Sequence, residues 1–165
     1  MPDLHPAADL QEMAEVHVAY ELEQMCLWAR QTSHSPIVNW ALLEAYLIHV
    51  RNVNEFLARP SDKVRVDAVV AEHYFTGRWT PTKPLLTNDQ LDDIHRRVAH
   101  LSIQRLQRNT PQGGFDWAGN GPLEQWARLV LRGFGRFLRD LAIESAERSE
   151  WFKPGYTAAK NVLQG

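Results

Sequence analysis

Residues 35–58 read SPIVNWALLEAYLIHVRNVNEFLA, and this stretch decides the fold class. Ser35 followed by Pro36 is typical of a helix start, because serine caps a first turn and proline fits the first helical position. Pro60 predicts that the helix ends near Ala58. Apolar residues occur on every side of this helix, so the pattern predicts a central helix surrounded by partners.

Three further segments carry the periodicity of long helices. In residues 7–31, a spacing of three and four residues predicts one shared helix face, made of Leu10, Met13, His17, Tyr20, Gln24, Leu27 and Trp28. Residues 87–108 open with a capping box that begins at Thr87. Residues 122–148 carry an inward face made of Leu123, Trp126, Ala127, Val130, Phe134, Phe137, Leu138 and Leu141. The sequence therefore predicts an all-α fold, an up-and-down bundle of four long helices plus a short connecting helix over residues 64–75.

The chain has 165 residues, of which 44 % are hydrophobic and 23 % are charged, as in an ordinary globular domain. We assign residues 1–148 to a single helical-bundle domain, with a loop over residues 109–122. Residues 149–165 show no helical period and predict a C-terminal tail that is loose or packed only through Trp151 and Phe152.

Composition and motifs exclude several classes of function. The net charge of −2 shows no global basic excess, and the single cysteine, Cys26, excludes an internal disulfide and a CxxC metal site. A ferritin-like metal site needs two Glu-x-x-His motifs, whereas the chain offers one loose relative, Asp92-x-x-His95. We expect no metal, no cofactor, no membrane span and no signal peptide, and hence a cytoplasmic protein.

Arginines form the first candidate site. Arg128, Arg132, Arg136 and Arg139 follow one another at spacings of four, four and three, which makes one stripe on the last helix. The arginine fork suits phosphate, so the stripe can follow a nucleic-acid backbone with weak, salt-sensitive affinity. The alternative is a solvated face, partly paired through Glu124 and Asp140.

Arg51 and His100 form the second candidate site. Converging between helices, they could promote attack of a ribose 2′-hydroxyl on its phosphate, with His100 moving protons and Arg51 stabilising charge. The alternative is structural: Arg51 is mostly buried and paired with Glu44 or Glu55, because a buried charge needs a partner.

The motif Leu47-x-His49-x-Arg51-Asn52 resembles a family of small uncharacterised prokaryotic helical proteins, over roughly residues 35–108. More distantly, Arg51 and Asn52 on a bundle helix are similar to the HEPN superfamily, many of whose members are metal-independent ribonucleases that act as dimers. In that motif a histidine follows on the same helix, and this chain has none there. The resemblance implies a nucleotide-binding helical domain, with Asn52 among its binding residues.

Three functions therefore stay open: a nucleotide- or partner-binding domain without catalysis, an endoribonuclease using Arg51 and His100, and an antitoxin-like accessory subunit that binds protein. We also expect a homodimer through the second or last helix, because Gly133 and Gly135 would admit a neighbouring helix. Alternatively, these glycines receive Trp40 or Trp117 of the same chain.

Overall fold

The computed structural model describes residues 5–31, 34–80, 85–87, 89–91, 94 and 121–164. Within these ranges the chain is mostly helical and contains no β-strand, so its described part is all-α. The helices are α1 (Ala7–Glu12), η1 (Met13–Val18), α2 (Ala19–Trp28), α3 (Pro36–Ala58), α6 (Gly121–Glu144) and α7 (Ala146–Gln164). Two short 3₁₀ turns, η2 (Ser61–Lys63) and η3 (Ala71–Tyr74), lie between α3 and α6.

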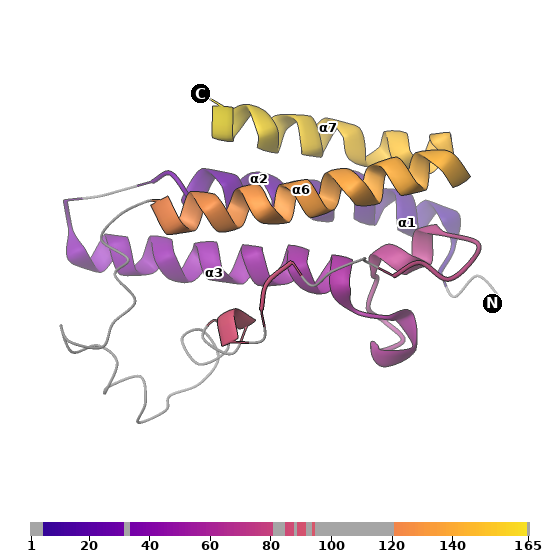
Figure 1. Ribbon diagram of the computed structural model, residues 1–165, viewed down its shortest axis with the longest axis horizontal. Helices are drawn as coiled ribbons and strands as arrows, with labels where there is room; N and C mark the ends of the chain where they lie inside the picture. The colour runs from indigo at the N-terminus through magenta and orange to yellow at the C-terminus, as the bar shows by residue number, and fades with distance from the viewer. Residues whose placement is uncertain are drawn as a thin grey trace.

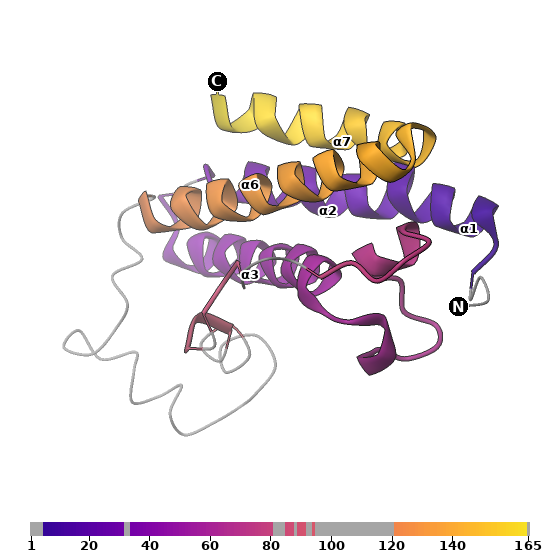
Figure 2. The ribbon, with the colours of Figure 1, turned by 45° about the vertical axis from the view of Figure 1, so that its right-hand side comes forward.

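The long helices pack side by side around one core. Helix α2 packs against α3 and α7, and α6 packs against the same two helices. In Figure 1, α3 and α6 run from left to right, whereas α1–α2 and α7 run the opposite way. Figure 2 shows α3 and α7 at opposite edges of the bundle. The third predicted helix, residues 87–108, lies almost wholly outside the described residues, so the complete up-and-down order stays a prediction.

Helix α3 begins at Pro36 and ends at Ala58, as predicted. Its predicted enclosure on all sides is wrong, because Ile48 is 40 % exposed and Asn52 is also exposed. The buried face of α3 carries Leu43, Tyr46, Leu47, Val50, Val53 and Leu57. The Tyr46 hydroxyl donates to the carbonyl of Leu123 at 2.7 Å and ties α3 to α6. One outer strip of α3 therefore faces solvent.

The first long helix contains a π-helical segment, η1, and this changes which face is buried. Buried residues follow one another as Leu10, Ala14, Val18, Leu22, Met25, Cys26 and Ala29. The predicted face included His17 and Tyr20, both of which are exposed. A π-helix has a wider turn than an α-helix, so positions four apart stay on one face through η1. The predicted face was therefore right at Leu10 but wrong at His17 and Tyr20, although the helix itself was found.

The last part of the chain is helical and packed, which corrects the predicted loose tail. The predicted helix 122–148 ends instead at Glu144. Ser145 directly precedes α7, and its hydroxyl oxygen accepts a hydrogen bond from the backbone N–H of Arg148 at 3.3 Å, as an N-cap residue does. Helix α7 buries Ser149, Phe152, Gly155, Ala159 and Leu163. The predicted boundary between residues 148 and 149 therefore falls inside a helix that packs on α2 and α6.

The connection after α3 is less regular than predicted. Only residues 71–74 of the predicted helix 64–75 are helical, as η3, and residues 64–70 form turns and extended backbone. The capping box at Thr87 is confirmed: the Thr87 N–H donates to Gln90 at 2.8 Å, and the Gln90 N–H donates back to the Thr87 hydroxyl at 3.3 Å. The predicted loop 109–122 lies outside the described residues except at 121 and 122, which are helical.

The space beside the two interior glycines of α6, Gly133 and Gly135, is filled by side chains of the same chain. A Cβ on Gly133 would overlap the side chain of Leu85, and a Cβ on Gly135 would lie 2.5 Å from the hydroxyl oxygen of Tyr156. The prediction that side chains of the same chain fill this space is therefore confirmed, and among the described residues the occupants are Leu85 and Tyr156. Trp117 and the side chain of Trp40 lie outside what the structure describes. The two glycines give no support to a dimer interface on α6.

Candidate functional site

The arginine stripe of α6 is the most distinctive surface of the described chain. Its members, which we call the arginine ridge, are Arg128, Arg132, Arg136 and Arg139, and all four are exposed. The opposite face of α6 buries Val130, Phe134, Phe137 and Leu141 in the core. The helix thus fixes the direction of the ridge, which confirms the prediction that it faces solvent.

The arginines of the ridge differ in their partners. An Nη of Arg128 lies 3.2 Å from a carboxylate oxygen of Glu124 and also donates to the carbonyl of Leu163 at 2.8 Å. Within the part of the chain that the structure describes, no carboxylate pairs with Arg132, Arg136 or Arg139. Among the described residues, these three guanidinium groups therefore have no carboxylate partner, and their N–H donors can bind a ligand.

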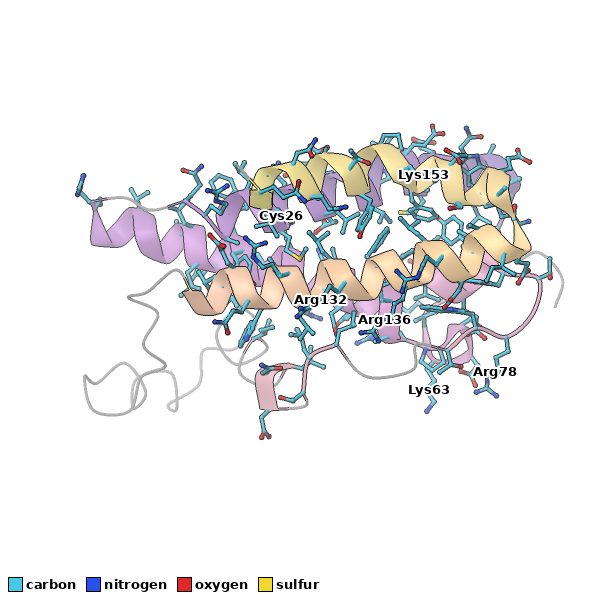
Figure 3. The ribbon with its side chains drawn as sticks, turned by 45° about the horizontal axis from the view of Figure 1, so that its top comes forward. Cys26, Lys63, Arg78, Arg132, Arg136 and Lys153 are labelled. Carbon is cyan, nitrogen blue, oxygen red and sulfur yellow. The ribbon has the colours of Figure 1, made fainter. Side chains whose placement is uncertain are left out.

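The predicted pair between Arg136 and Asp140 is not formed. Asp140 instead accepts a hydrogen bond from the indole N–H of Trp79 at 3.1 Å. This bond holds the connection after η3 against the outer side of α6. Figure 3 shows Arg132 and Arg136 along α6 and, lower in the view, Lys63 of η2 and Arg78 of the connection after η3. Trp79 was not among the residues chosen from the sequence.

Arg51 is paired, as predicted, but less buried than predicted. Its Nε lies 2.8 Å from a carboxylate oxygen of Glu55, and the two side chains are 28 % and 24 % exposed. The same oxygen of Glu55 accepts a hydrogen bond from Arg59 at 3.3 Å. The buried polar residue of α3 is instead Asn54, which is 2 % exposed. His100 lies outside the described residues, and so does the distance between Arg51 and His100 on which the nuclease hypothesis depends.

Arg51→Ala is expected to lower the free energy of unfolding by about 1 kcal/mol. The mostly buried position inferred from the sequence would have made the loss roughly 3 kcal/mol or more, but a partly solvated pair contributes less. Glu55 would also retain Arg59 as a partner. Urea denaturation of the variant measures the loss. Arg65→Ala, which breaks the exposed pair with Asp67, is the control with a smaller effect. A loss of roughly 3 kcal/mol or more for Arg51→Ala would contradict this assignment.

Cys26 is buried in the core on α2. Burial raises the pKa of the Cys26 thiol to about 12, with Arg128 opposing the shift more weakly. The thiol therefore stays protonated at neutral pH, and a protonated thiol is a poor nucleophile. Its environment is that of a packing residue.

Two histidines that the sequence did not single out, His5 and His73, lie with ring centroids 4.9 Å apart. The Nε2 atom of each is buried without a hydrogen-bond partner among the described residues. Burial, followed by the nearby His5, lowers the pKa of His73. In the same part of the chain no three His, Cys, Asp or Glu side chains converge, and Asp92 and His95 lie outside it. The histidine pair is thus short of the three protein ligands that a catalytic zinc site uses.

Comparison with protein-family models, curated proteins and solved structures found no match to this chain. The resemblance to HEPN proteins consequently rests on Arg51 and Asn52 alone, and it remains a proposal. In the described part of the chain, none of the helices is both long enough and apolar enough to cross a bilayer. The arginine ridge and its surroundings are therefore the basis for a proposed function.

Proposed function

We propose that this protein is a HEPN-like helical binding domain without catalysis, whose ligand is a nucleic-acid backbone held by the arginine ridge. The observation that supports the proposal is the exposure of Arg132, Arg136 and Arg139 with no carboxylate paired to them within the described residues. The chain as a whole has a net charge of −2, so the ridge is a local feature rather than the result of a basic composition.

The shape of the ridge fits this ligand. Because an α-helix rises 1.5 Å per residue, Arg128 and Arg139 are separated by about 16 Å along α6. Along one strand of a stacked helix the phosphates advance about 3.4 Å per nucleotide, so roughly five stacked nucleotides span that length. Planar guanidinium groups donate two parallel hydrogen bonds to phosphate oxygens, which favours arginine over lysine for this role.

The rival functions have weaker support. Arg51 is engaged by Glu55, which offsets the charge that an endoribonuclease would aim at phosphate. An accessory subunit that binds protein has no specific feature in its favour, among the described residues, beyond the exposed strip of α3. A homodimer and a cytoplasmic location, both expected from the sequence, remain part of the proposal. A buried free cysteine fits a reducing compartment.

The test replaces Arg132, Arg136 and Arg139 together by glutamine and measures binding to single-stranded RNA by filter titration at several salt concentrations. For four engaged phosphates, the logarithm of the wild-type association constant should fall with the logarithm of salt at a slope of about −3. Loss of three contacts should make that slope shallower by about 2.

A charge-matched control separates a local site from general attraction. The substitutions Arg59→Gln, Arg65→Gln and Lys153→Gln remove the same three positive charges from residues that are paired with carboxylates. Affinity and slope should stay close to those of the wild type. Equal losses in both triple variants, or no binding by the wild type at low salt, would refute the proposed function.

A further inference from the structure

We infer that the nucleic acid on the arginine ridge is single-stranded, and that Trp79 stacks against one of its bases. This inference rests on the proposed function and specifies its ligand. It starts from the position of Trp79, whose indole N–H donates to Asp140 of α6 at 3.1 Å. Asp140 follows Arg139 directly and lies one helical turn after Arg136, so the ring is held beside the ridge.

Neighbouring rings fix the orientation of Trp79. Its ring stacks on Phe75 with centroids 5.3 Å apart and planes at 4°. Phe137 meets it at 70° with centroids 5.5 Å apart, which anchors it to the core. Trp79 is nevertheless partly exposed, and within the described residues no other ring or cation covers it. A rigid, partly exposed aromatic loses little conformational entropy when a base stacks on it.

Two further exposed cations lie on the connection between α3 and α6 that carries Trp79. Arg78 precedes Trp79 and is exposed, and Lys63 is exposed on the same connection. In Figure 3 both project from the lower side of the molecule, below the part of α6 that carries Arg132 and Arg136. Phosphate-binding cations beside a stacking ring are typical of single-strand binding, because stacking tolerates any base. In a duplex the bases are already stacked inside the helix, so only the backbone contacts remain.

The test compares Trp79→Leu with the wild type on a single-stranded RNA of about ten nucleotides and on a duplex of the same length. Loss of one stacked base should weaken single-strand binding by about 5- to 100-fold. Duplex binding and the salt slope should be unchanged, because the phosphate contacts persist. Trp79→Phe keeps an aromatic face and should retain most of the affinity. Trp151→Leu makes the same change at a half-exposed tryptophan of α7 and should have no effect on binding.

A second measurement uses the wild type alone, in case Trp79→Leu weakens the fold. An abasic ribose-phosphate oligomer of equal length keeps the phosphates and lacks the bases. Stacking predicts that the wild-type protein binds it about 5- to 100-fold more weakly than RNA. Equal binding of the abasic oligomer, or of the duplex, would overturn the inference while leaving the arginine ridge as the binding site. Failure of the arginine variants to lower affinity would instead refute the proposed function itself.

Discussion

Phe137→Ala is expected to lower the free energy of unfolding by about 4 kcal/mol, among the largest losses for a single substitution in this chain. Phe137 is fully buried on α6. Six rings surround it at centroid distances of 5.1 to 6.4 Å: Phe56, Tyr74, Phe75, Trp79, Phe134 and Phe152. These rings come from α3, the connection after it, α6 and α7, so a cavity here would loosen the packing among all of them.

Urea denaturation, with the slope of unfolding against denaturant checked for a change, measures this loss. Ile143→Ala is the matched control, since it truncates a large apolar residue of the same helix that is 87 % exposed. Its effect should lie within about 0.5 kcal/mol. A loss of less than about 1 kcal/mol for Phe137→Ala would mean that the six rings do not form one tightly packed core.

Local sequence signals made α3 and α6 predictable. The apolar face of α6 was found residue by residue, because its inner and outer sides differ sharply in polarity. The bounds of α3 followed from Ser35–Pro36 at its start and Pro60 after its end. These signals act through local backbone chemistry, which a single sequence contains.

Residues 149–165 were predicted to be a tail because they show no helical period, and the predicted segment contains Pro154 and Gly155, which have low helix propensity. In the structure both lie inside α7, where packing against α2 outweighs their low helix propensity. The buried face of the first helix failed for a different reason. A π-helical segment rotates every later position around the helix axis, and none of the residue types in η1 is specific for a π-helix.

The candidate site was predictable only in part. The arginine ridge follows from spacing along one helix, so the sequence was enough to find it. Trp79 lies 61 residues from Asp140 in the chain, and only the fold brings the two side chains together. The same limit applied to Gly133 and Gly135, whose occupants, Leu85 and Tyr156, come from other elements.

The second large expected effect concerns a close approach between two helix backbones. A Cβ on Gly155 of α7 would lie 2.5 Å from the Cβ of Ala19 and 2.7 Å from the backbone α-carbon of that residue, which belongs to α2. A side chain could turn aside from such an overlap, but here α2 and α7 must move apart. We expect Gly155→Ala to lower the free energy of unfolding by about 2 to 3 kcal/mol, despite the gain of about 1 kcal/mol in helix propensity.

Two variants test whether the overlap is the cause. Gly77→Ala adds a methyl group where nothing lies within 4 Å, so its effect should stay within about 0.5 kcal/mol. Ala19→Gly combined with Gly155→Ala removes the overlap with the methyl group of Ala19 but leaves the overlap with the α2 backbone, so the double variant should recover only part of the loss. The single variant Ala19→Gly completes the cycle and measures its own cost in helix propensity, about 1 kcal/mol. Urea denaturation of all five proteins, wild type included, then shows how far the loss depends on position 19. If Gly155→Ala instead stabilises the protein through its gain in helix propensity alone, α2 and α7 do not approach closely enough to require a glycine at position 155.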